Sequence, residues 1–243
     1  SPFGVETTKI ISIYLQTIGI SNRWLDARNF INTSDDYRQA VVNWDATNEV
    51  ITNLLKPLVN RQLVITQGFI GRTNHNNSTT LGREGSDYSA SIFAYGLDAE
   101  SVTIWKDVAG IMNADPKLMK DTTIMREISF NKAIELAYYG ATIIHPKTIQ
   151  PLLKKGIPLY VKSFINPDDE GSVVLAHESG TESDVPCYIF KDAQVLVQIA
   201  SKDLSFIVES HLSKIFAILA EYKVQISLMQ NSAVSFSFCA NYD

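Results

Sequence analysis

The chain has 243 residues, 45% of them hydrophobic, an ordinary composition for a globular protein with one sizeable domain and one small domain. Its formal net charge is −5 with acidic and basic residues interspersed, so it lacks the basic face that binds nucleic acid or an anionic membrane surface. No apolar run reaches the length of about 18 residues that a membrane-spanning helix needs, and no signal peptide is recognisable. We therefore expect neither nucleic acid nor a membrane among its partners.

The two cysteines, Cys187 and Cys239, lie far apart and follow no metal-binding or redox spacing. Unpaired cysteines of this kind are typical of a reducing compartment, so we expect a cytoplasmic protein. The chain opens on Ser-Pro without an initiator methionine, and we interpret it as a piece of a longer protein.

The first third of the chain alternates between helical and strand patterns. Apolar residues at helical spacing predict helices over Lys9–Ile18 and Asp45–Val59, and short apolar runs predict strands over Trp24–Ala27 and Leu63–Thr66. Helix and strand in alternation favour parallel βαβ units with right-handed crossovers. We therefore predict an α/β fold.

A glycine-rich loop containing Arg72 and Arg83 follows the Leu63–Thr66 strand. Its glycines allow positive φ or a close approach to a ligand: Gly68, Gly71, Gly82 and Gly85. The loop leads into a helix with Ser86 or Asp87 as its expected N-cap and Gly96 as its expected stop. A strand, a glycine loop with arginine and a helix N-terminus together predict an anion-binding site.

Three strands and two helices are predicted in the rest of the first domain: strands at Ser101–Trp105, Pro158–Lys162 and Ser172–Leu175, and helices at Ser129–Tyr139 and from Pro146 to Gly156. The loop from Lys106 to Lys117 lies beyond the carboxyl end of a strand, where open α/β sheets bind ligands. His145 precedes a proline at the first helical position, so we interpret it as a cap or packing residue.

The pattern changes after a polar stretch at His177–Ser183, which we interpret as a linker. Apolar residues then predict a strand, a helix and two more strands. We expect two domains, residues 1–178 and residues 187–243.

Two motifs in the glycine loop, QGFIG and TTLGREGSDYSA, resemble the aspartate kinase signature within the amino-acid kinase family. The resemblance implies an α/β/α fold around a parallel sheet. It also implies that the substrate-binding positions are Phe69, Thr80, Arg83 and Ser86, and that Asp87 and Arg83 act at the reaction centre. A planar guanidinium pairs bidentately with a carboxylate, so Arg83 suits the α-carboxylate of the substrate.

The segment KDVAGIMNADPK resembles the nucleotide loop of the same family. The implied ATP-binding positions are Lys106, Asp107, Met112, Lys117 and Thr142. The family usually has threonine in place of Lys106, tyrosine in place of Met112, arginine in place of Lys117 and lysine in place of Thr142. The chain also lacks the family's opening Lys-Phe-Gly-Gly-Thr-Ser phosphate loop, and Gly4 falls where a glutamate is expected.

The C-terminal string LMQNSAVSFSF resembles the start of an ACT regulatory module, a small ferredoxin-like α+β unit. Such modules bind an end-product amino acid, commonly lysine or threonine, where two modules pair. The resemblance implies a homodimer and, as candidate effector-binding residues, Gln225, Ser227 and Asn231. The alternative interpretation is that these three are ordinary solvent-facing strand residues.

The resemblance implies that ATP, with Mg²⁺, phosphorylates the β-carboxylate of L-aspartate to 4-phospho-L-aspartate, the first step of lysine, threonine and methionine biosynthesis. A side-chain carboxyl with a pKa of about 3.9 is ionised at neutral pH, so this reaction needs no general base. Positive charge and positioning must carry the catalysis. Two alternatives remain open: a kinase for another acidic amino acid such as glutamate, and a non-catalytic regulatory chain that senses an amino acid.

Overall fold

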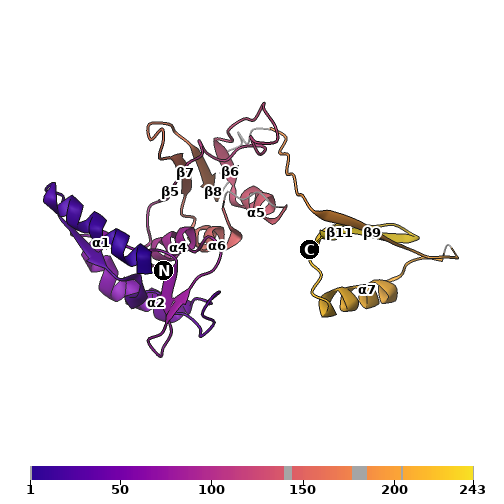
Figure 1. Ribbon diagram of the computed structural model, residues 1–243, viewed down its shortest axis with the longest axis horizontal. Helices are drawn as coiled ribbons and strands as arrows, with labels where there is room; N and C mark the ends of the chain where they lie inside the picture. The colour runs from indigo at the N-terminus through magenta and orange to yellow at the C-terminus, as the bar shows by residue number, and fades with distance from the viewer. Residues whose placement is uncertain (1, 140–143, 177–184, 204, 243) are drawn as a thin grey trace. The chain divides into compact units, whose positions relative to one another are not determined.

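The computed structural model describes residues 2–139, 144–176, 185–203 and 205–242 (Figure 1). The chain divides into two compact units, residues 1–188 and 189–243. Within the described stretches, no helix is both long and apolar enough to cross a membrane.

The N-terminal part of the first unit pairs two parallel strands, β1 (Asn22–Leu25) and β2 (Leu63–Thr66), with Leu25 opposite Thr66. Helix α1 precedes them and spans Pro2–Thr17, so the observed helix begins well before the predicted start at Lys9. The predicted strand at Trp24–Ala27 was placed too late, because Ala27 begins a short 3₁₀ helix, η1 (Ala27–Asn29).

The predicted helix over Asp45–Val59 is three consecutive segments: α2 (Trp44–Val50), the π-helical η2 (Ile51–Leu55) and α3 (Lys56–Val59). Asn43 caps its start, since the Asn43 side chain accepts a hydrogen bond from Ala46 N–H. Pro57, which has no N–H to donate, is the second residue of α3, after the π-helical segment ends at Leu55.

The glycine loop contains a small antiparallel hairpin, β3 (Ile70–Arg72) and β4 (Ser78–Thr80). Among the four loop glycines only Gly82 has a positive φ, +80°. Close packing explains two of the others, because a Cβ on Gly71 or Gly85 would lie 2.7 Å from a neighbouring side chain.

Helix α4 (Gly85–Leu97) begins and ends differently from the prediction. Its N-cap is Glu84, in the left-handed region at φ 53°, with no side-chain cap, so Ser86 and Asp87 lie inside the first turn. Its C-cap is Asp98, also left-handed, and Gly96 lies within the helix. Tertiary packing is the reason, because Gly96 lets α4 approach η2 closely.

The second half of the first unit is a four-stranded sheet in the order β5-β7-β8-β6, and helices α4, α5 and α6 share its apolar core. Its elements are β5 (Val102–Lys106), β6 (Glu127–Ser129), α5 (Phe130–Tyr139), α6 (Pro146–Lys155), β7 (Leu159–Ser163) and β8 (Ser172–Leu175). Strands β5 and β7 are parallel, as are β6 and β8, whereas β7 and β8 are antiparallel. Strand β6 was not predicted.

Helices α4 and α6 pack side by side in Figure 1, and Ser91 Oγ donates a hydrogen bond of 2.7 Å to Thr148 O between them. The capping prediction for α6 is confirmed, because His145 Nδ1 accepts from Lys147 N–H at 3.1 Å and Gly156 ends the helix at φ 65°. One apolar core lies around α4, α6 and the sheet, and a second around η1, η2 and β3. The unit is therefore of the predicted α/β class.

The second unit has three antiparallel strands in the order β10-β11-β9 and one helix (Figure 1). Its elements are β9 (Gln194–Ala200), α7 (Glu209–Glu221), β10 (Ile226–Asn231) and β11 (Ser235–Asn241). Phe236 and Phe238 on β11 are buried, and the partly buried Leu212 and Ile215 of α7 pack against them. The predicted order of strand, helix, strand and strand is confirmed.

Replacement of Gly96 by alanine should destabilise the protein by about 1–3 kcal/mol, because the new methyl group would lie 2.7 Å from Ile51 Cγ2. Gly4→Ala is the matched control in another helix, since a Cβ there meets nothing within 4 Å. Urea unfolding of both variants measures the difference. Equal stabilities would contradict the close packing of α4 on η2.

Candidate active site

The candidate site forms where the first turn of α4 meets the carboxyl end of β5. Lys106 Nζ lies 3.1 Å from Asp87 Oδ2, and the two side chains are only 22% and 20% exposed. A half-buried ion pair is screened less than a surface pair. The structure thus joins one predicted reaction-centre residue to one predicted nucleotide residue.

Phe69 lies in a strained backbone conformation beside α4. Its φ is 75°, in the left-handed region that a bulky residue rarely adopts. Its N–H donates to Ser89 Oγ at 2.8 Å, and its carbonyl accepts from Leu81 N–H at 2.9 Å. These contacts hold Phe69 between α4 and the end of the glycine loop.

Thr80 uses its hydroxyl to hold a neighbouring segment. Thr80 Oγ1 donates to Arg38 O at 2.9 Å, with Tyr37 O at 3.2 Å, and Ala40 N–H donates to Thr80 O at 3.0 Å. A donating hydroxyl keeps lone pairs that can accept a further hydrogen bond. In this structure Thr80 therefore attaches residues 37–40 to the hairpin.

Arg83 and Ser86 are exposed on either side of the start of α4. Among the ion pairs of the described residues, none includes Arg83. Glu84 Oε2 is buried and has no hydrogen-bond partner within the described part of the chain. An exposed guanidinium at the start of a helix suits an anionic ligand.

His145, the N-cap of α6, lies in the electrostatic field of this loop. Burial lowers the pKa of His145 from its ordinary value; the charge of Glu84 opposes this shift, and the charges of Lys147 and Arg83 add to it. We therefore expect a neutral imidazole at pH 7 that serves as a cap.

The loop after β5 is attached to the sheet through its backbone. Phe164 N–H donates to Lys106 O at 2.9 Å, and Ile111 N–H donates to Ser172 Oγ at 2.8 Å. Asp107 and Lys117 are exposed on this loop. Their charges are thus available to a ligand at the carboxyl end of β5.

The other two predicted nucleotide residues are placed differently. Met112 is partly buried and forms a β-bridge with Ile124, so its backbone is engaged within the fold. Thr142 lies outside the described residues.

The three predicted effector residues lie on or next to β10. Gln225 is exposed just before the strand, and Asn231 ends it opposite Phe236. Ser227 Oγ accepts a hydrogen bond of 2.6 Å from Lys191 Nζ. Ser227 therefore has a partner within the unit, whereas the other two side chains face solvent.

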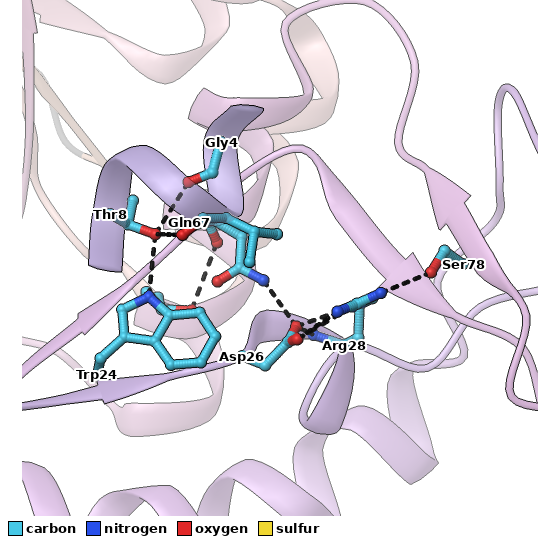
Figure 2. Close-up of polar contacts among 9 residues, drawn as sticks. Gly4, Thr8, Trp24, Asp26, Arg28, Gln67 and Ser78 are labelled. Atoms are coloured by element: carbon cyan, nitrogen blue, oxygen red, sulfur yellow. Dashed lines mark hydrogen bonds and ion pairs between the residues drawn. The ribbon is translucent and has the colours of Figure 1, made fainter. Parts of the chain in front are cut away.

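Polar residues outside the predicted site gather at the carboxyl ends of β1 and β2 (Figure 2). Gln67 Nε2 donates to Asp26 Oδ1 at 2.6 Å, and Arg28 Nη2 donates to Asp26 Oδ2 at 2.6 Å. Asp26 and Gln67 each directly follow a strand, and carboxyl ends of parallel strands meet at one edge. That position was the signal available in the sequence.

An open cleft of about 300 Å³ lies elsewhere on this unit. None of the predicted site residues lines it. Its lining is Thr33, Ser34, Asp35, Val41, Val42, Asn43, Asn74 and His75.

The side chains at the candidate site suit a nucleotide with a divalent cation better than a metal cage. Among the described residues, no group of three or more His, Cys, Asp or Glu side chains could hold a metal ion alone. Mg²⁺ commonly binds one or two carboxylates together with substrate phosphates, and Asp87 and Asp107 offer such oxygens. Lys106 and Lys117 offer the ammonium groups that phosphates attract.

The imidazole of His145 should titrate below its ordinary pKa of 6.5. Because the folded state then binds the proton less readily than the unfolded state, stability is lost as the pH falls below 6.5. His145→Asn keeps an N-cap but does not titrate, so this part of the pH dependence should disappear. Residue-specific NMR titration and urea unfolding above and below pH 6.5 test this. A midpoint at or above 6.5 would contradict it.

Comparisons with known proteins find similarity in sequence and in fold. The model of the Amino acid kinase family matches residues 5–163. Lysine-sensitive aspartokinase 3 of Escherichia coli (strain K12) is 34% identical over 216 residues, 89% of this chain and 48% of that protein. Aspartokinase 1, chloroplastic, of Arabidopsis thaliana is 32% identical over 244 residues, 95% of this chain and 41% of that protein.

Solved structures of E. coli aspartokinase III are also similar. The complex with aspartate and ADP has a TM-score of 0.82 at 32% identity and covers 99% of this chain and 53% of its own. The complex with lysine and aspartate has a TM-score of 0.80 at 32% identity, covering 98% and 53%. The chain spans about half the length of these relatives. The sequence motifs, the α/β fold and the matched family model show that this chain belongs to the amino acid kinase family.

Proposed function

We propose that this chain is part of an aspartate kinase, which uses ATP to phosphorylate the β-carboxylate of L-aspartate to 4-phospho-L-aspartate. The proposal rests above all on the 3.1 Å contact between Asp87 and Lys106, because it joins the helix after TTLGR to the start of the KDVAGIMNADPK loop. The solved E. coli relative binds aspartate and ADP in the same fold. The product would enter lysine, threonine and methionine biosynthesis.

Electrostatics rather than proton transfer dominates the proposed reaction. The attacking carboxylate is already ionised at neutral pH, so its repulsion from a triphosphate is the main obstacle. ATP supplies the phosphoryl group, and Mg²⁺ neutralises part of its charge. The chain's own task is to hold both reactants with fixed positive charge and little reorganisation.

On the substrate side, Arg83 is the proposed clamp for a carboxylate of aspartate. Its guanidinium is exposed and belongs to no ion pair among the described residues. The backbone around Phe69, a lone pair of Thr80 and the exposed hydroxyl of Ser86 complete this side of the site. Asp87 would keep the Lys106 ammonium oriented toward the reacting groups.

On the nucleotide side, Lys106 and Lys117 are the proposed phosphate contacts, and Asp107 is a further polar group on the same loop. Lysines act as point charges rather than forks, so they attract phosphate without bidentate geometry. Met112 and Thr142 would border the nucleotide more loosely. The β-bridge of Met112 to Ile124 supports a packing role for this residue.

The second unit, residues 189–243, is the proposed ACT-like regulatory part. The predicted linker at His177–Ser183 lies outside the described residues. It would bind lysine or threonine near Gln225, Ser227 and Asn231. Strands β9 and β10 each pair with one neighbour among the described strands, so their other edges are open to a partner. A homodimer through these modules, in the cytoplasm, completes the proposal.

The full-length protein should form an acyl phosphate with MgATP and aspartate but not with glutamate. Hydroxylamine traps the acyl phosphate as a hydroxamate, which is measured by its iron complex. Adding lysine or threonine should lower the signal if the second unit is regulatory. Signal with glutamate alone would identify a different acidic amino-acid kinase. Folded protein that binds ATP but gives no signal would identify a regulatory chain.

Arg83→Ala should raise the KM for aspartate about 10- to 150-fold, because charge-assisted hydrogen bonds contribute about 1.5–3 kcal/mol. Arg83→Lys should fall between the wild type and the alanine variant, since it keeps the charge without the fork. Arg61→Ala removes another exposed arginine and serves as the control. An unchanged KM for aspartate in Arg83→Ala would refute the clamp.

A further inference from the structure

A buried amide lies directly before the glycine loop and depends on a single carboxylate. Gln67 is 2% exposed, and its Nε2 donates to Asp26 Oδ1 at 2.6 Å (Figure 2). Its Oε1 accepts no hydrogen bond from the described residues. A buried amide with one partner keeps its orientation only while that partner is present. Asp26 therefore fixes the side chain that begins the loop.

Asp26 is itself held by Arg28. Arg28 Nε lies 3.0 Å from Oδ1 and Nη2 lies 2.6 Å from Oδ2, a two-pronged contact, while Arg28 N–H also donates to Oδ1 at 3.0 Å. Burial acts to raise the pKa of Asp26, but the hydrogen bonds and charge of Arg28 and the bond from Gln67 outweigh it, so this pKa is lowered. The carboxyl is thus ionised at neutral pH and accepts from both neighbours.

The same cluster reaches the far arm of the hairpin. Arg28 Nη1 donates to Ser78 Oγ at 2.9 Å, and Ser78 is the first residue of β4, as Figure 2 shows. Strand β4 ends at Thr80, just before Arg83. One carboxylate therefore connects to the entry of the loop at Gln67 and, through Arg28, to its exit strand.

The nucleotide loop is held by different contacts. Phe164 N–H donates to Lys106 O, and Ser172 Oγ accepts from Ile111 N–H. Among the described residues, the side chains of Asp26 and Arg28 form hydrogen bonds and ion pairs with each other, with Gln67 and with Ser78, and none of these contacts reaches the nucleotide loop. The Asp26 cluster therefore contacts the glycine loop, on the proposed substrate side of the site, and not the nucleotide loop.

We propose that Asp26 is a positioning residue that, through Gln67 and Arg28, aligns the loop carrying Phe69, Thr80 and Arg83 for the acidic substrate. This inference rests on the proposed function of that loop. If Asp26 only stabilised the fold, its replacement would lower the folded fraction and weaken the apparent binding of aspartate and MgATP alike. A positioning role alters substrate binding selectively.

Kinetics of the full-length protein test the inference. Asp26→Asn should raise the KM for aspartate about tenfold and change the KM for MgATP by no more than about twofold. Ser78→Ala removes only the link from Arg28 to β4, so it should raise the KM for aspartate less. Asp98→Asn is the matched control, because Asp98 pairs with Lys56 and Lys155 at the other end of α4. Asp26→Glu, which restores the carboxylate, should recover part of the loss.

Hydrogen exchange without substrate separates this inference from the proposed function. In Asp26→Asn, amides of residues 67–85 should exchange faster, while those of β5 and β7 keep the wild-type rate. This result supports positioning even if the wild type proves inactive with aspartate, which would refute the proposed function only. Unchanged exchange in the loop, equal rises in both KM values, or the same effect in Asp98→Asn would overturn the inference.

Discussion

The ion pair between Asp87 and Lys106 is the contact on which the candidate site depends. It joins the first turn of α4 to the carboxyl end of β5, the next element of the chain, so the loop before α4 and the loop after β5 lie beside one pair of charges. Both side chains are largely removed from solvent, and salt therefore screens their attraction less than that of a surface pair. The pair holds an ammonium group in place before any anionic ligand arrives. A positive charge fixed in this way can stabilise negative charge without reorganising during a reaction.

The glycine loop before α4 contains only the short β3–β4 hairpin, and contacts from neighbouring elements hold the rest of it in place. Phe69 keeps a left-handed conformation because Ser89 and Leu81 hydrogen-bond to its backbone on both sides. The Asp26 cluster holds the start of the loop and strand β4. Backbone strain persists only where surrounding contacts determine it, so this loop is as precise as the two strands and the helix that support it.

The two units differ in how they bury apolar surface. The first has two cores built from strands and several helices, whereas the second relies on a single helix packed on one face of three strands. A small sheet with open edges is marginal alone and favours association with another chain or segment. The proposed regulatory role is consistent with this, because an effector acts by biasing such an association.

Local sequence determined most of the elements and the family, and tertiary structure decided the site. Strand β8 and the caps of α6 at His145 and Gly156 follow from signals within a few residues, so they were predicted correctly. The ends of α4 were predicted wrongly, because the close packing of Gly96 on Ile51 outweighed its preference for a helix end. The pairings of Asp87 with Lys106 and of Asp26 with Gln67 appear in no local pattern. They exist only because the chain brings the ends of separate strands and the start of a helix to one place, and that depends on how the whole core packs.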